Sequence, residues 1–208
     1  MKKVYRMICS LFCICLMVNM LCAFANAQEI ESQNEDVCQM LTAICSDTDS
    51  SMLDFIRVAN PKFYSRLTDE QQAAFDAMNY QAALNGTYSS GSARVLSGYV
   101  LHAGMTFHAK RPIMYYSLYF QTVAADGGSV NLLTVGGTTT VTDNYTHDVV
   151  ATSSDEDVNT DSLYIEEHTR DFVCGRYHTN ACTIYGIDPY NQPFADVATK
   201  VEYTPYYD

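Results

Sequence analysis

The residues best suited to chemistry in this sequence lie between positions 155 and 166. Asp155, Asp157, Asn159 and Asp161 alternate with other residues, and Glu166 follows five positions later. Oxygen-bearing side chains at positions 1, 3, 5 and 7 with a glutamate at position 12 have the spacing of an EF-hand calcium loop. Because the sharp-turn position lacks glycine and neither flank is helical in pattern, the segment does not predict a complete EF-hand. The favoured interpretation is a solvated acidic loop, and the alternative is an acidic interstrand loop that binds Ca²⁺ in a β domain.

Histidines and a glutamate form the second group of candidate residues. His102 and His108 share one face of a predicted strand, and Glu166 and His168 share a face of another. Such pairs can serve acid–base catalysis, although exposed histidines on a polar strand face are the commoner outcome. The chain contains no G-x-S-x-G, H-E-x-x-H or P-loop motif. We therefore assign no catalytic residue, and a secreted hydrolase with a His/Glu site remains the alternative function.

A row of tyrosines is the third group. Tyr115 and Tyr119 lie on one face of a predicted strand over residues 112–124, where successive side chains are about 7 Å apart. Tyrosine suits stacking against a glycan or contact with a protein partner. The alternative is that helices cover this face and make it part of the core. The sequence leaves both interpretations open.

Cysteines after residue 27 number four: Cys38, Cys45, Cys174 and Cys182. An even number in an exported chain predicts two disulfides and no free thiol. Cys38 and Cys45 on a continuous helix would be about 10 Å apart along its axis, beyond the limit of about 7 Å for a disulfide. Cys174 and Cys182 could be joined across a local hairpin, and the pairing stays open.

The first 27 residues have the layout of a secretory signal peptide. Lys2, Lys3 and Arg6 precede an apolar stretch over residues 7–24, and Ala25-Asn26-Ala27 supplies small residues before Gln28. We expect a secreted protein, periplasmic or extracellular, cleaved after Ala27 and not inserted in the membrane thereafter. The alternative is an uncleaved anchor.

Removal of this segment leaves 9 Lys and Arg residues against 24 Asp and Glu residues, a net charge of −15. Such a surface repels phosphate backbones and anionic headgroups, which excludes nucleic acid as a partner class. Cations, basic proteins and neutral glycans remain compatible.

Hydrophobic spacing predicts helices over residues 35–46, 50–59 and 68–84, the last beginning with a Thr68–Gln71 capping box. Alternation and turn residues predict about eight strands from residue 93 onwards, with turns at Asp126-Gly127-Gly128 and at Gly136-Gly137. We expect an α+β protein, with a helical segment over residues 28–90 packed on or beside a mainly antiparallel β-sandwich over residues 91–208.

The final hairpin, in which Thr183-Ile184-Tyr185-Gly186-Ile187 leads to Asp188-Pro189-Tyr190-Asn191 and returns to Val201, resembles that of immunoglobulin-like and fibronectin type III modules of bacterial surface proteins. The chain lacks tryptophan and the tyrosine corner of those domains. The resemblance implies a fold class and no function. Taken together, the sequence favours an exported non-enzymatic binding or structural module, with a calcium-stabilised adhesin-like domain or a hydrolase as alternatives.

Overall fold

The computed structural model describes residues 34–86, 93–96, 98–110 and 112–206, and Cys38–Asp208 form one compact unit. The predicted signal peptide over residues 1–27 lies outside the described residues. No helix within the described ranges is long and apolar enough to cross a bilayer.

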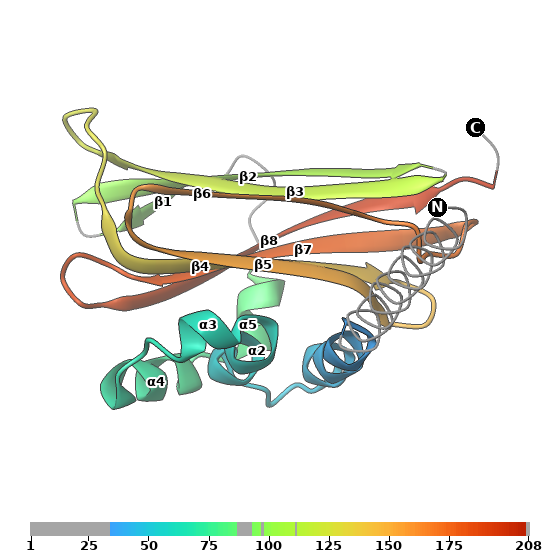
Figure 1. Ribbon diagram of the computed structural model, residues 1–208, viewed down its shortest axis with the longest axis horizontal. Coiled ribbons are helices and arrows are strands. Elements are labelled where there is room, and N and C mark those ends of the chain that lie inside the picture. Colours follow the sequence, from blue (N-terminus) through green and yellow to red (C-terminus); the bar gives the residue numbers. More distant parts are fainter. Residues whose placement is uncertain (1–33, 87–92, 97, 111, 207–208) are drawn as a thin grey trace, which may run out of the picture. The chain divides into compact units, whose positions relative to one another are not determined.

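Two four-stranded antiparallel sheets form the body of the molecule (Figure 1). The first sheet has the order β1-β2-β3-β6, with β1 at Ala93–Leu96, β2 at Tyr99–Lys110, β3 at Ile113–Ala124 and β6 at Ser162–Thr169. The second has the order β5-β4-β7-β8, with β5 at Val149–Thr160, β4 at Leu132–Asp143, β7 at Arg176–Ile187 and β8 at Pro193–Thr204. The predicted α+β class with a β-sandwich is confirmed.

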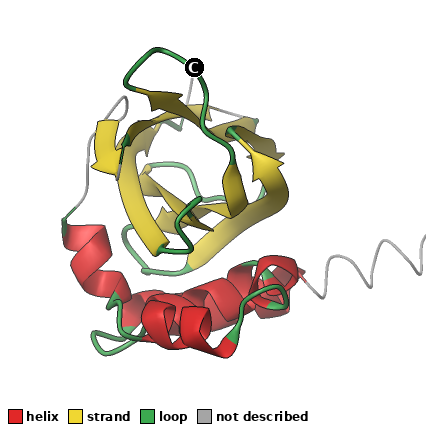
Figure 2. Ribbon diagram, turned by 90° about the vertical axis from the view of Figure 1, so that its left-hand side faces the viewer, coloured by secondary structure: helices red, strands yellow, loops and turns green. Residues whose placement is uncertain are grey.

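Helices lie on one side of this sandwich (Figure 2). Residues 34–46 are helical and are followed by α2 (Met52–Ala59), α3 (Pro61–Tyr64), α4 (Asp69–Asp76) and α5 (Tyr80–Asn85). The Thr68–Gln71 capping box is present at the start of α4. The single helix predicted over residues 68–84 is instead broken, because Asn79 caps α5 by accepting a hydrogen bond from the Ala82 amide and pairs with Ser51 in a β-bridge.

Gly136 and Gly137 lie within β4, so the turn predicted there is wrong. A Cβ at Gly136 would be 2.2 Å from the Tyr185 ring, and one at Gly137 would be 2.9 Å from Leu118. The two glycines therefore serve close packing on the two faces of a central strand. Gly98, by contrast, does separate β1 from β2, and its φ of 85° favours glycine.

The space between the sheets contains two hydrophobic clusters, one around Leu118 and Ile184 and one around Phe107 and Val141. Cys182 is 1% exposed in this core. It donates a hydrogen bond to the Ser117 carbonyl at 3.6 Å and accepts one from the Asn180 amide. Burial raises the pKa of Cys182 to about 12.

Neither of the two predicted disulfides is present among the described residues, where Cys38, Cys45, Cys174 and Cys182 are free thiols. The local hairpin that could have joined Cys174 to Cys182 does not form, because β7 runs without a break from Arg176. Six residues of extended strand separate Arg176 from Cys182 by about 20 Å. Cys174, which lies just before this strand, is therefore too far from Cys182 for a disulfide. Cys38 and Cys45 lie on one continuous helix, whose rise keeps them apart.

Candidate functional site: the tyrosine face of the first sheet

The described helices α2 to α5 cover the second sheet and leave the outer face of the first sheet open (Figure 1). The Phe63 ring of α3 lies edge-on to the Tyr185 ring of β7 at 4.8 Å, and the Asn60 amide donates to the Asp155 carbonyl of β5 at 2.9 Å. Accordingly β4 is buried on both faces from Thr134 to Val141, whereas β3 alternates. The interpretation that helices turn the tyrosine row into core is therefore wrong.

Register between β2, β3 and β6 arranges the open face in four rows that run across the strands. We call the set the tyrosine face. Its rows are His108–Tyr115–His168, Thr106–Ser117–Glu166, Gly104–Tyr119–Tyr164 and His102–Gln121–Ser162. Tyr115, Tyr119 and Tyr164 are 47%, 50% and 59% exposed. Both tyrosines predicted from the sequence thus lie at the surface, joined by a third.

Tyr119 lies across its neighbour on β2, Gly104. A Cβ placed on Gly104 would be 2.1 Å from Cε1 and 2.6 Å from Cζ of the Tyr119 ring. Only a residue without a side chain allows this close approach. The glycine supports one side of a ring that is otherwise half exposed, and it therefore holds Tyr119 as a platform on the sheet.

Tyr164 and Tyr115 also have fixed neighbours. The Tyr164 hydroxyl donates to Oε2 of Glu166 at 2.6 Å, and this hydrogen bond raises the pKa of Tyr164. The Tyr115 ring lies 6.1 Å from the His168 ring, tilted by 39°. Three aromatic side chains of the face are thus oriented before any ligand arrives.

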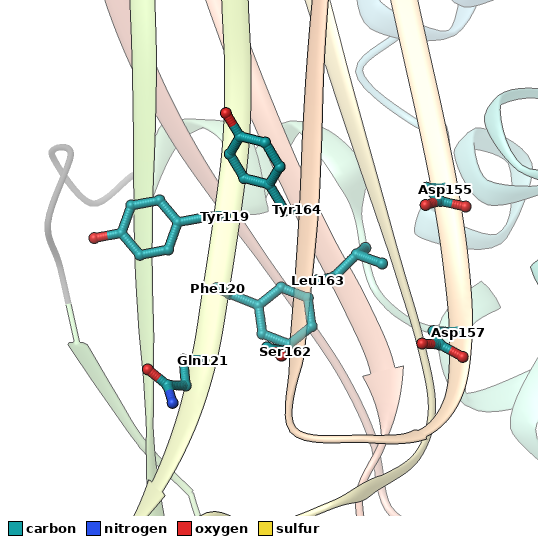
Figure 3. Close-up of a pocket in the computed structure, with 8 residues that line it drawn as sticks. All are labelled: Tyr119, Phe120, Gln121, Asp155, Asp157, Ser162, Leu163 and Tyr164. Atoms are coloured by element: carbon teal, nitrogen blue, oxygen red, sulfur yellow. The ribbon is translucent and has the colours of Figure 1, made fainter.

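A pocket of about 500 Å³ adjoins the Tyr119–Tyr164 row (Figure 3). Its lining consists of Tyr119, Phe120, Gln121, Asp155, Asp157, Ser162, Leu163 and Tyr164. Figure 3 shows the two tyrosines on one side and the two aspartates of β5 on the other, with Leu163 between them. The lining therefore combines aromatic rings, an amide, a hydroxyl and two carboxylates.

The acidic segment predicted to be a calcium loop is a strand. Asp155, Asp157 and Asn159 belong to β5, Asp161 lies in the turn after it, and Glu166 is on β6. Pairing with β4 extends this segment, so successive carboxylates on one face are about 7 Å apart and do not surround a point. Within the described residues, no group of three or more His, Cys, Asp or Glu residues is placed to hold a metal ion.

The histidines of the hydrolase hypothesis share the tyrosine face without converging. His108 and His168 flank Tyr115 in one row, and His102 is six residues further along β2, about 20 Å away. Glu166 accepts its hydrogen bond from Tyr164. A hydrolase site would need His102 or His108 within hydrogen-bond reach of Glu166, and no such contact is present among the described residues.

Sequence reasoning missed Tyr164, Gly104 and Ser162. Strand alternation alone places Tyr164 on the same face of β6 as Glu166, but only the β3–β6 register shows that this residue stands opposite Tyr119. No local signal marks Gly104 as the support of a ring on another strand.

No protein-family model and no curated protein sequence matches the chain. Among solved structures, it is similar to Bacteroides uniformis β-glucuronidase 2, at 7% identity and a TM-score of 0.32 over 49% of this chain and 13% of that one. A putative β-galactosidase from Bacteroides fragilis gives 7% identity and a TM-score of 0.33, over 49% of this chain and 16% of that one. The putative ApaA protein from Bordetella pertussis gives 10% identity and a TM-score of 0.32, over 54% of this chain and 99% of that one. The chain thus spans less than a fifth of the first two proteins, and likenesses at these scores carry no assignment.

Proposed function

We propose that this protein is an exported, non-enzymatic binding module whose recognition surface is the tyrosine face. The observation that carries the proposal is the Tyr119 ring held over Gly104 beside Tyr164, on a sheet face that none of the described helices covers. Tyrosine offers a large amphipathic contact area with few rotatable bonds. Side chains that are fixed in advance lose less conformational entropy on binding.

The rest of the face supports recognition more than catalysis. Its remaining side chains are hydroxyl, amide, imidazole and carboxylate groups distributed over four rows. The hydroxyl–carboxylate pair of the face is Tyr164 with Glu166, and no described histidine is hydrogen-bonded to either residue. The hydrolase alternative therefore lacks the His–Glu approach that it requires.

Export belongs to the same proposal and rests on the sequence of residues 1–27. In an exported setting, the β7–β8 hairpin and the sandwich favour an immunoglobulin-like or fibronectin-like surface module. The turn of this hairpin is fixed by Asp188, whose Oδ1 accepts the amides of Tyr190 and Gln192 at 2.8 and 2.7 Å. The intact mass of secreted protein tests export, with Gln28 expected as the first residue.

A binding screen tests the function itself. Purified protein is applied to an array of glycans and, separately, to cell-surface proteins, together with Tyr119→Ala, Tyr164→Ala and the control Tyr145→Ala. Tyr145 is 76% exposed and lies in the turn after β4, outside the tyrosine face. We expect a ligand that both face variants lose and the control retains. A ligand that all three variants bind as tightly as the native protein would contradict the proposal.

A further inference from the structure

We infer that the ligand of the tyrosine face is an uncharged polysaccharide chain, an inference that rests on the proposed binding function. A sugar ring presents an apolar C–H face and a rim of hydroxyl groups. The pocket beside Tyr119 and Tyr164 has matching surfaces: two aromatic rings, the Gln121 amide, the Ser162 hydroxyl and the carboxylates of β5.

The two aspartates of the pocket are oriented as hydrogen-bond acceptors. Oδ1 of Asp155 accepts the amide of Glu156 at 2.9 Å, and Oδ1 of Asp157 accepts the amide of Val158 at 2.7 Å. These bonds engage Oδ1 of each carboxylate, and no hydrogen bond within the described residues engages Oδ2 of either. Hydroxyl groups donate to such oxygens with charge-assisted hydrogen bonds. Gln121 supplies both a donor and an acceptor at the other side of the pocket.

Charge excludes acidic glycans. The eight lining residues include two carboxylates and no lysine, arginine or histidine. Asp161 and Glu166 add negative charge on the neighbouring turn and strand. A uronate, sulfate or phosphate group in the pocket would be repelled and would lack a cationic partner.

The distribution of apolar side chains favours a glycan over a protein. Among the exposed large hydrophobic residues of the described chain, those on the tyrosine face are Tyr115, Tyr119 and Tyr164. Protein interfaces place desolvated apolar anchors at their centre. Here the rows between and beside the tyrosines contain Thr106, Gln121 and Ser162, whose groups hydrogen-bond to hydroxyls.

A basic peptide could also contact rings and carboxylates, but Glu166 is already hydrogen-bonded to Tyr164, and the carboxylates of the pocket lie to one side of the rings. Tyr115 and Tyr119 are four residues apart on β3, about 14 Å. That span matches an extended ligand longer than one sugar ring and places its chain along the strands.

Affinity gel electrophoresis of the purified protein tests the ligand class. The gels contain a neutral glucan, xylan or mannan, an acidic polygalacturonate, or cationic chitosan, and polylysine serves as the peptide probe in a parallel titration. We expect retardation by at least one neutral polymer. This retardation should not change between about 0.05 M and 0.5 M NaCl, a range over which exposed ionic contacts become screened. Tyr119→Ala and Tyr164→Ala should each weaken it about tenfold, equivalent to about 1.4 kcal/mol, and Tyr145→Ala should not.

Other outcomes separate the ligand class from the binding function. Salt-sensitive retardation by chitosan or polylysine alone, lost in Tyr119→Ala, would overturn the neutral glycan and leave the face as a binding site. Retention of a cell-surface protein in the screen above with no retardation by any polymer would do the same. Neutral-polymer binding that neither tyrosine variant weakens would overturn both the ligand assignment and the proposed surface.

Discussion

Replacement of Gly136 by alanine should destabilise the sandwich through its contact with the helix layer. The new Cβ would be 2.2 Å from Cε2 and 3.0 Å from Cζ of Tyr185. Tyr185 cannot move away, because it is 0% exposed, its hydroxyl bonds Thr138 Oγ1 at 2.7 Å and its ring contacts Phe63. Overpacking of this kind costs about 1–3 kcal/mol of unfolding free energy. For a domain of this size the melting temperature should fall by roughly 2–12 °C.

Gly104→Ala is the matched control, because it also places a Cβ about as close to a tyrosine ring, 2.1 Å from Cε1 of Tyr119. Tyr119 is half exposed and can rotate into solvent. Alanine also restricts the unfolded chain more than glycine, so Gly104→Ala should be neutral or stabilising by up to about 1 kcal/mol. Urea unfolding measures both variants, with an unchanged m-value as the sign that only stability differs. If Gly136→Ala and Gly104→Ala lowered the free energy of unfolding equally, the argument that the exposure of the facing tyrosine ring decides the loss of stability would be refuted.

Three further predictions concern titration, thiols and metal. Burial lowers the pKa of His178, against the opposing charge of Asp143. As the pH falls below about 6.5, the unfolded chain therefore takes up a proton that the folded chain does not. The free energy of unfolding should decrease by up to about 1.4 kcal/mol for each pH unit of this fall. Urea unfolding between pH 7.5 and 5 should show a shallower fall for His178→Gln, and an identical slope would argue against this role. Thiol titration of unreduced, denatured protein should find four thiols after residue 27. In native protein Cys182 should not react, because it is buried and its pKa is raised. A titration value near zero in the denatured protein would show instead that the four cysteines form disulfides. Melting curves with millimolar Ca²⁺ and with chelator should coincide, since β5 holds its carboxylates apart; a rise that Asp157→Ala abolishes would instead show a calcium site.

Two errors of sequence interpretation come from residue types that usually indicate a turn or loop but lie within long strands here. Glycine in a strand pattern usually indicates a turn or a bulge, and the sequence therefore predicts a turn at Gly136-Gly137. In the structure, both residues leave room for side chains from other elements, Tyr185 on one face and Leu118 on the other. The composition of the acidic run after Ala151 likewise predicts a loop, yet pairing with β4 makes this run part of an edge strand. Charged side chains on an edge strand also discourage pairing with other chains.

The sequence by itself determined features that depend on neighbours along the chain. These include the Thr68–Gln71 capping box, the alternation that puts Tyr115 and Tyr119 on one face, the hairpin after Ile187 and the class of the fold. Such features follow from backbone periodicity and local hydrogen bonds, which a few adjacent residues specify. Only the tertiary structure decided which sheet the helices cover, and hence that the tyrosines are exposed. It also decided that Tyr164 stands beside Tyr119 and that Gly104 supports its ring. Strand register and layer packing join residues that lie far apart along the chain, such as Phe63 and Tyr185, and no local pattern relates them.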